Sequence, residues 1–330
     1  MYNLEEVFAS FNHQKALIIG DVMIDSYIWG EVQRISPEAP VPIVNTKKTE
    51  KRLGGAANVA VNLQALGAVP ILCAVVGQDI EGQDLLGLLQ NLQMPTDGIV
   101  QSQDRITTIK HRILAGHQHL LRVDSEMTHL LAMQEKETLW NKIELLLPHT
   151  QVVIFEDYDK GVLDKELIQR TVALAKQHQI PTIVDPKLRN FWHYEGVTVF
   201  KPNLKELKEG LKIDLKPNNI PVLKDAIKIL KERLKLEQAL VTLSEFGVYI
   251  DAQESQHHIA AYFRSIADVS GAGDTVVSVA ALALASKLSP KLMAGLANLA
   301  GGLVCEQLGV VPITHERLYL EAQKYWHELV

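Results

Sequence analysis

The stretch DVSGAGDTVVSVAALALA, Asp268 to Ala285, decides the fold of this chain. Two glycines flank an alanine, an aspartate follows, and the chain then becomes apolar and rich in small residues. Gly271 and Gly273 permit turn conformations that larger residues avoid, and the apolar run behind them predicts a buried helix. A glycine turn that leads into a helix presents free backbone N–H groups and the positive end of the helix dipole. The stretch therefore predicts an anion-binding turn at the start of a core helix.

Asp274 would lie in the first turn of this helix. A carboxylate beside an amide turn that holds a phosphate is well placed to accept a proton from an attacking hydroxyl. The alternative is an acidic residue that only favours the start of the helix through the dipole. The sequence contains no GxxxxGK[ST] motif, and no GxGxxG follows the first expected strand. It therefore predicts neither a P-loop nor a Rossmann dinucleotide site.

The composition is that of a globular, acidic chain. It has 330 residues, of which 47% are hydrophobic and 22% are charged, and a formal net charge of -6. This charge argues against nucleic acid or an anionic membrane surface as a partner. Cys73 and Cys305 lie in apolar surroundings and are expected as buried thiols. The N-terminus MYNLEEVFAS lacks a signal-peptide pattern and no apolar run reaches membrane-spanning length, so we expect a cytoplasmic protein.

Short apolar segments alternate with helical patterns through most of the chain. Residues 56–67 and 164–179 have the spacing of helices, with Gly67 as a C-terminal cap. Apolar segments separated by helices predict a buried, mostly parallel sheet in an α/β fold, where ligands bind beyond the carboxyl ends of the strands. The segments expected as strands are residues 16–25, 70–79, 151–159, 181–187, 197–203 and 239–247.

Two segments, at about residues 27–53 and 105–124, depart from this alternation. The first contains three prolines and has no helical period. The second has two strands of alternating polarity around a turn at Gly116. We expect both segments to form a small β-strand lid beside the core, within a single domain over residues 1–330.

Three further stretches carry polar residues at expected strand or helix ends. GDVMID ends the first expected strand with the carboxylates of Asp21 and Asp25, and LGGAANVAVNLQALG places Asn58, which can bond sugar hydroxyls, in the first turn of a helix. KPNLKEL places Asn203 and Glu206 on one face of a helix start, where they suit a hydrated Mg2+. The same pair is equally an N-cap with its capping-box glutamate.

Together these stretches resemble one family. GGAAN (54–58), KPNLKE (201–206), VTLSEFG (241–247) and DVSGAGDTV (268–276) are similar to the motifs of the ribokinase, or PfkB, sugar kinases, over essentially the whole chain. GDVMIDSYIWGEVQRISPEAPVPIV, TTIKHRILAGHQHLLRVD, EDYDKG and VDPK further resemble the D-glycero-β-D-manno-heptose 7-phosphate kinases of lipopolysaccharide core synthesis. In many bacteria that kinase is fused to an adenylyltransferase. The chain has no HxGH-type nucleotidyltransferase motif, so we expect the stand-alone kinase.

The resemblance implies a ribokinase-like three-layer α/β/α sandwich with a mostly parallel sheet and a β-strand lid that builds a homodimer. It implies ATP and Mg2+, commonly with stimulation by a monovalent cation such as K+. The implied reaction is phosphorylation of the heptose 7-phosphate at the anomeric 1-hydroxyl, which gives the 1,7-bisphosphate for ADP-heptose synthesis. Two alternatives stay open: another PfkB-family sugar or nucleoside kinase, or a catalytically silent sugar-binding protein of the same fold.

The resemblance also assigns roles in catalysis and metal binding. Asp274 corresponds to the catalytic base, and the backbone N–H groups of Gly271, Ala272 and Gly273 correspond to the anion hole for the transferred phosphoryl group. Asp268 corresponds to a residue that helps to hold the monovalent cation, or is structural.

Other residues correspond to ligands of the two substrates. Glu206 would bind magnesium through water. The residues expected on the sugar side are Asp21, Asp25, Gly54, Gly55, Asn58 and Asp157. The residues expected on the nucleotide side are Asn203, Glu206, Thr242, Ser244, Gly247, Gly271 and Asn298.

A sugar 7-phosphate needs basic partners, and the expected lid offers them. Lys110 and Arg112 alternate on one face of a strand, and Arg122 lies on its expected partner strand. A solvated face is the alternative for each residue, but as a group they predict a phosphate site, to which the arginine fork is suited. The basic residues considered for this role are Arg34, Lys110, Arg112, Arg122, Lys160, Lys187 and Arg189.

Two positions depart from the resemblance. Ser270 stands where threonine is common, which keeps the hydroxyl. Glu156 precedes DYDKG where a small residue is usual, and this leaves the local charge open.

Overall fold

Nine strands form the main sheet of the computed structural model, which describes residues 2–116, 118–252 and 255–330. Their order is β13-β12-β11-β10-β9-β8-β1-β4-β5, and all neighbours from β11 to β5 are parallel. β12 and β13 extend one edge in the antiparallel direction. The strands are β1 (Lys15–Gly20), β4 (Val69–Gly77), β5 (Ile99–Ser102), β8 (Val152–Glu156), β9 (Thr182–Asp185), β10 (Val199–Phe200), β11 (Gln238–Thr242), β12 (Val248–Ala252) and β13 (Ser255–Ile259).

The central strands are apolar throughout because both faces of the sheet are buried. In β1, Ala16 and Ile18 belong to one hydrophobic core, while Leu17 and Ile19 belong to the other. Side chains alternate between the faces of a strand, so a strand with a core on each side has no polar positions. This explains why the predicted strand segments were continuous apolar runs.

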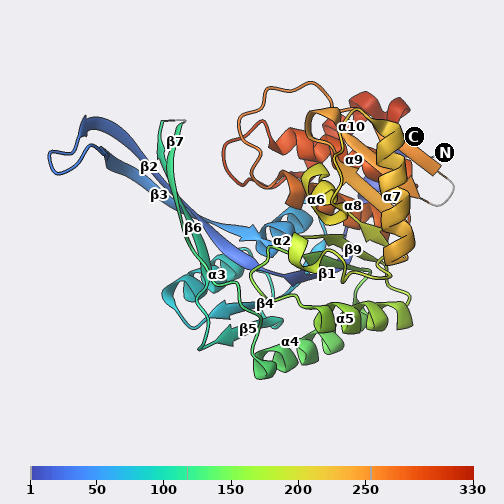
Figure 1. Cartoon of the computed structure of the whole chain (residues 1–330), viewed down its shortest axis with the longest axis horizontal. Helices are drawn as coiled ribbons and strands as arrows, with labels where there is room; N and C mark the ends of the chain where they lie inside the picture. Colours follow the sequence, from blue (N-terminus) through green and yellow to red (C-terminus); the bar gives the residue numbers. More distant parts are fainter. Residues whose placement is uncertain (1, 117, 253–254) are drawn as a thin grey trace.

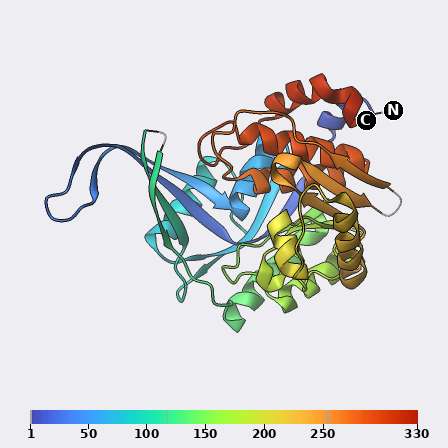
Figure 2. The same cartoon turned by 45° about the horizontal axis from the view of Figure 1, so that its top comes forward.

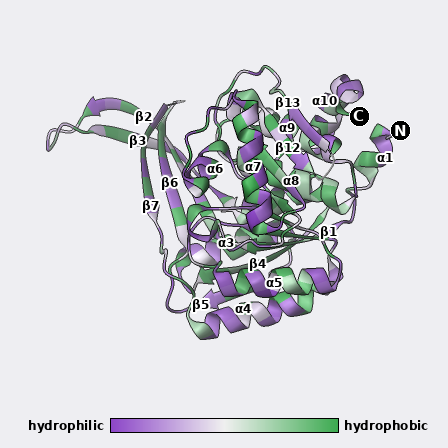
Figure 3. Ribbon diagram, turned by 45° about the vertical axis from the view of Figure 1, so that its right-hand side comes forward, coloured by the Kyte–Doolittle hydropathy of each residue, from purple (hydrophilic) through white to green (hydrophobic). Residues whose placement is uncertain are grey.

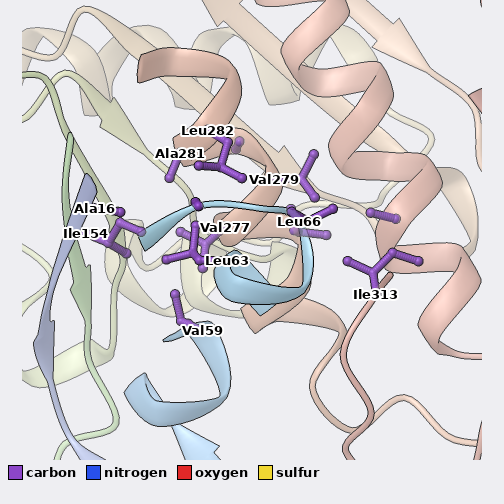
Figure 4. Packing of buried hydrophobic residues seen from close by; sticks show 14 of the residues in the cluster. Ala16, Val59, Leu63, Leu66, Ile154, Val277, Val279, Ala281, Leu282 and Ile313 are labelled. Carbon is purple, nitrogen blue, oxygen red and sulfur yellow. The ribbon is translucent and has the colours of Figure 1, made fainter. Parts of the chain in front are cut away.

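Helices cover both faces of the sheet and complete three layers, as predicted (Figure 1). Figure 4 shows Val59 and Leu63 of α2 with Val277 of α8 in the core of one face. Figure 3 shows hydrophilic and hydrophobic residues along α5 and α7, which cover the other face. The helices are α1 (Leu4–Ala9), α2 (Ala56–Ala65), α3 (Ile80–Asn91), α4 (Met133–Leu146), α5 (Lys165–Gln177), α6 (Leu204–Leu211), α7 (Ile220–Leu234), α8 (Ala272–Ala285), α9 (Pro290–Val304) and α10 (His315–Leu329).

Within the described residues, no helix has both the length and the apolar character needed to cross a membrane.

Four strands form a second, smaller sheet that projects from the body of the molecule (Figures 1 and 2). Its order is β3-β2-β6-β7, in which β2 pairs antiparallel with β3 and parallel with β6. We call it the lid sheet. Its strands lie in and around the two segments that the sequence predicted as β structure. They are β2 (Val22–Ile35), β3 (Pro42–Gly55), β6 (Thr108–Ala115) and β7 (Gln118–Ser125).

One predicted strand, residues 16–25, is two strands in the structure. β1 ends at Gly20 in the main sheet, and β2 begins at Val22 in the lid sheet. The change of sheet leaves no mark in hydropathy because Val22 and Ile24 are buried against the same core as β1. Asp25 therefore lies inside a lid strand and not at the end of a core strand.

Candidate active site

The glycine turn forms as predicted and leads directly into α8. Gly271 is the N-cap of this helix and has a φ of 80°, a left-handed conformation that glycine adopts without strain. The turn lies against the end of β9, because a Cβ added at Gly273 would be 3.3 Å from Oδ2 of Asp185. The start of α8 thus meets the carboxyl ends of the parallel strands, where a ligand is expected.

Asp274 is buried in the first turn of α8, with both carboxylate oxygens bound. Asn58 Nδ2 donates to Oδ2 at 2.6 Å, and the hydroxyl of Tyr158 donates to Oδ1 at 2.6 Å. Burial raises the pKa of Asp274 above its ordinary value, although both hydrogen bonds lower it. The raised pKa brings the carboxylate closer to the range that suits a general base.

The residues predicted for the sugar side meet where the lid sheet joins the core. Asp25 of β2 is only 3% exposed, forms an ion pair with Arg112 of β6, and lies against Gly54. Gly55 leads directly into α2, which carries Asn58 in its first turn. Asp25, Arg112 and Asn58 therefore approach Asp274 from the lid and from α2.

Two other predicted sugar ligands bind the protein itself. Asp21 accepts hydrogen bonds from the backbone N–H groups of Tyr158, Lys160 and Val162. Burial, with the nearby charge of Asp157, raises the pKa of Asp21 to about 6. Asp157 accepts hydrogen bonds from Asn190 Nδ2, from the hydroxyl of Tyr194 and from the backbone N–H of Asp159. Both carboxylates hold the loop that carries Tyr158.

A cavity of about 830 Å³ opens beside the glycine turn. Its walls include residues 271–274, the turn after β11, the loop after β13 and part of α9. The predicted nucleotide residues that line it are Asn203, Thr242, Ser244, Gly247, Gly271 and Asn298. This volume lies in the range of small-molecule sites, and the anion-binding turn lies at one wall.

Charged side chains line part of this cavity, namely those of Asp185, Lys187 and Lys201. Lys201 is 2% exposed and its Nζ lies 2.9 Å from Oδ2 of Asp185. Lys187 Nζ lies 2.5 Å from Oε1 of Glu206. Although burial lowers the pKa of Lys187, Asp185 and Glu206 outweigh it and raise that pKa. Both lysines are therefore cationic, and both line the cavity beside the glycine turn.

Asn203 and Glu206 form the capping box that the sequence left as an alternative. Asn203 Oδ1 accepts from the backbone N–H of Glu206 at 2.8 Å, and Glu206 Oε2 accepts from the backbone N–H of Asn203 at 2.9 Å. The carboxylate of Glu206 is thus engaged by a backbone N–H and by Lys187, so it would reach a metal only through water. Among the described residues, no group of three or more His, Cys, Asp and Glu side chains is placed to hold a metal ion.

Asp268 binds the glycine turn. Its Oδ1 accepts from the backbone N–H and the hydroxyl of Ser270, at 3.0 and 2.9 Å. Its Oδ2 accepts from the backbone N–H of Gly309 at 2.9 Å. These bonds favour the structural alternative for the carboxylate of Asp268.

Glu156, one of the two positions that depart from the resemblance, ends β8 next to Asp185 of β9. Its side chain is fully buried, and neither carboxylate oxygen has a hydrogen-bond partner among the described residues. Burial, with the charges of Asp185 and Asp274, raises the pKa of Glu156 well above its ordinary value. Burial therefore favours the protonated form of this carboxyl group.

The basic residues do not gather in one place. Burial lowers the pKa of Lys110, and the charges of Lys160 and Arg122 lower it further. These three side chains therefore lie close together, and they share the base of the lid sheet with Arg112. Arg34 is exposed near the far end of β2, away from the core, and Lys187 lines the cavity beside the glycine turn. Arg189 contacts a separate cavity beside α5.

Several site residues were not singled out from the sequence. Tyr158 lies in the EDYDKG stretch, but nothing in that stretch indicates its bond to Asp274. Lys201 precedes the KPNLKE asparagine and is buried, which a lysine in sequence does not suggest. The one available signal was their position, since both lie near the carboxyl ends of predicted strands.

Comparisons with known proteins agree with this geometry. The sequence profile described as the pfkB family of carbohydrate kinases matches residues 13–316. The chain is 40% identical over 323 residues to the bifunctional protein HldE of Methylobacillus flagellatus, which covers 97% of this chain and 66% of that protein. It is 41% identical over 299 residues to the HldE of Wolinella succinogenes, which covers 91% and 62%. The chain thus spans less than two thirds of the length of these relatives.

Solved structures show the same fold at low sequence identity. Phosphofructokinase-2 of Escherichia coli in complex with potassium superposes with a TM-score of 0.78 at 19% identity, over 96% of this chain and 99% of that one. The ribokinase of Arabidopsis thaliana complexed with ribose and ATP superposes with a TM-score of 0.70 at 17% identity, over 95% and 99%. Because the family profile matches residues 13–316 of its 330 residues, the chain belongs to the pfkB family of carbohydrate kinases.

Proposed function

We propose that this kinase transfers the γ-phosphoryl group of ATP to the anomeric 1-hydroxyl of D-glycero-β-D-manno-heptose 7-phosphate, giving the 1,7-bisphosphate. The observation that carries the proposal is the position of Asp274, between the glycine turn of α8 and Asn58 on the sugar side. The choice of sugar rests on the RISPEAPVP segment and on about 40% identity to HldE proteins. The adenylyltransferase activity of a longer protein is no part of the proposal.

Asp274 acts as the base in this reaction. It accepts the proton of the sugar hydroxyl as the hydroxyl oxygen bonds to the γ-phosphorus, while the bond to the β,γ-bridging oxygen breaks and ADP leaves. Asn58 and Tyr158 hold the carboxylate in place. The N–H groups of Gly271 and Gly273 would face the developing charge from the positive end of α8. The N–H of Ala272, which the resemblance also placed in the anion hole, donates to the carbonyl of Val269 at 3.2 Å.

The nucleotide would lie in the cavity with its phosphates toward Lys187 and the glycine turn. Glu206 would hold Mg2+ through water, which fits its engaged carboxylate and the lack of a larger ligand cluster among the described residues. When bound, the metal neutralises charge on the phosphates. A site for K+ next to Asp268 would use backbone carbonyls, because the carboxylate already binds the turn.

The 7-phosphate would bind the basic side chains at the base of the lid sheet. Burial lowers the pKa of Lys110, and Lys160 Nζ lies 2.8 Å from Glu126. Arg112 is bound to Asp25. A phosphate dianion would compete with these carboxylates for Lys110, Lys160 and Arg112. A neutral sugar carries no negative charge with which these cations could pair.

The lid sheet would also build a homodimer. It exposes several large apolar side chains, which are costly to leave in water and typical of an interface. A change of Leu121 to Asp should convert a dimer into monomers, as measured by light scattering. A wild-type monomer at micromolar concentration would contradict this part of the proposal. The exposed apolar residues of the lid sheet and its tip are Val32, Ile35, Val41, Leu121 and Val123.

The decisive experiment is a coupled ADP-release assay with four acceptors: the heptose 7-phosphate, ribose, fructose 6-phosphate and adenosine. Turnover restricted to the heptose phosphate, and lost in Asp274→Asn, supports the proposal. Turnover of a neutral sugar would retain the base and the anion hole but remove the lid phosphate site. If no acceptor is turned over, the chain is better described as a silent sugar-binding protein.

A further inference from the structure

A short loop, residues 308–310, lies between the lid sheet and the glycine turn. It follows α9, and the backbone N–H of Gly309 donates to Oδ2 of Asp268 at 2.9 Å. The side chain of Val310 packs on the turn, since a Cβ added at Gly271 would lie 3.4 Å from Val310 Cγ1. Asp268 in turn binds Ser270, the residue before Gly271. The loop therefore supports the anion hole from behind.

The lid sheet holds this loop from the other side. The hydroxyl of Tyr27 accepts from the backbone N–H of Val310 at 2.9 Å. Arg52 Nη1 donates to the carbonyl of Val310 at 3.0 Å and of Leu308 at 3.4 Å. Gly309 permits this approach, because it has a φ of 73° and an added Cβ would lie 3.0 Å from the Tyr27 hydroxyl and from Arg52 Nη1.

The same two side chains contact the sugar side. The ring of Tyr27 is fully buried between two guanidinium groups, with Arg52 4.9 Å and Arg112 5.4 Å from its centre. Arg112 forms the ion pair with Asp25, and Arg52 lies opposite Asp25 in the pairing of β2 with β3. An unbroken set of contacts therefore runs from Asp25, through Tyr27 and Arg52, to Asp268.

We propose that Tyr27 and Arg52 are positioning residues that set the geometry of the anion hole from the lid sheet. An anion hole stabilises charge only when its N–H groups are already aimed at the position where the charge develops. By fixing residues 308–310 against Asp268, the lid sheet would aim the N–H groups of the turn, and sugar binding at Asp25 would favour that state. The sugar identity rests on the proposed function, but the link itself concerns only residues of this chain.

The competing reading is that these contacts only attach the lid sheet to the core. Under that reading, loss of one contact would lower stability but leave the turn and the chemical step unchanged. The two readings therefore differ in the exchange of the turn amides and in kcat.

The test uses Tyr27→Phe, which removes the hydroxyl but keeps the ring, and Arg52→Met, which removes the donors but keeps the length. Arg52→Lys is the rescue variant. Lys47→Gln is the matched control, because within the part of the chain that the structure describes Lys47 pairs only with Glu31, on the exposed part of the lid sheet. Hydrogen exchange of the ligand-free protein is followed in peptides spanning 268–274 and 305–312, with α5 as the internal reference.

We expect faster exchange of both peptides in Tyr27→Phe and Arg52→Met, with α5 and Lys47→Gln unchanged. With the heptose phosphate and ATP, kcat should fall about tenfold while the KM for ATP changes less than about twofold. Arg52→Lys should recover part of kcat. Unchanged exchange of the 268–274 peptide in folded Tyr27→Phe and Arg52→Met would overturn the proposal, as would a wild-type kcat in both. If the wild-type protein fails to use the heptose phosphate, the proposed substrate is wrong, and the exchange experiment still decides the link.

Discussion

The hydroxyl of Tyr158 donates a 2.6 Å hydrogen bond to Oδ1 of Asp274, the carboxylate proposed as the base. Burial and the charge of Asp274 raise the pKa of Tyr158 well above 10, so the phenol stays protonated and remains a donor. The bond lowers the pKa of Asp274 and so opposes the effect of burial. The balance of these two effects sets the pH at which the base becomes active.

Tyr158→Phe should therefore move the acid limb of the pH–rate profile to higher pH. Loss of the donor raises the pKa of Asp274 further, so more of the base is protonated at a given pH, and kcat near neutral pH should fall about tenfold. The profile of kcat/KM against pH measures the shift. Tyr194→Phe is the control, because Tyr194 donates to Asp157 at 2.7 Å and not to the base. An acid limb that moves equally in both variants would contradict this role for Tyr158.

Asp274→Asn should lower kcat by about 100- to 10,000-fold, because the amide cannot accept the proton. Calorimetry with the ATP analogue AMP-PNP should show an affinity close to that of the wild-type protein, since the cavity walls are otherwise intact. Loss of nucleotide affinity equal to the loss of kcat would instead assign Asp274 to binding.

Glu156→Gln should make stability less dependent on pH. The carboxyl pKa of Glu156 is raised in the folded state, so its contribution to stability is fully present below the unfolded pKa and is lost as the pH rises through the folded pKa. The wild-type protein should thus lose up to about 1.4 kcal/mol of unfolding free energy per pH unit relative to the variant across that interval. Urea unfolding from pH 4 to pH 8, on the order of one measurement per pH unit, tests this slope. A constant difference between the two proteins would mean that Glu156 does not take up a proton on folding.

Asp21→Asn should destabilise the protein by about 1–3 kcal/mol. The amide has one acceptor oxygen for three backbone N–H groups, and its NH2 group would face an N–H that now donates to the carboxylate. The KM for the sugar phosphate should rise less in Asp21→Asn than in Asp25→Asn. Normal stability of Asp21→Asn together with the larger change in KM would instead support the prediction that Asp21 binds sugar.

Much of the fold could be predicted because its causes are local. The glycine turn before α8 and the alternation of apolar strands with helices both follow from backbone freedom and burial. The boundary between β1 and β2 could not be located, since Val22 and Ile24 remain buried after the chain changes sheets.

Residues of the site could be predicted only where their position depends on the local sequence. Asp274 and the Asn203–Glu206 pair are such cases, because each lies at the start of a helix. Tyr158 depends on a bond between residues 116 positions apart, and Tyr27 on one across 283 positions, so neither has a local signal. The basic residues were predicted as one group, but Arg34 lies near the far end of the 14-residue strand β2, away from the site.

The connections of the lid sheet have a mechanical consequence. Only Asp21 separates β1 from β2, and β3 passes into α2 without an intervening residue. The hairpin of β2 and β3 is thus joined to the core at Asp21 on one side and at the first turn of α2, which carries Asn58, on the other. A movement of the hairpin about Asp21 would therefore also move this first turn. A force applied at the far tip would be shared among the irregular pairings near Trp29 and Val32, the contacts of Tyr27 and Arg52 with residues 308–310, and the hydrogen bond between Asn58 and Asp274.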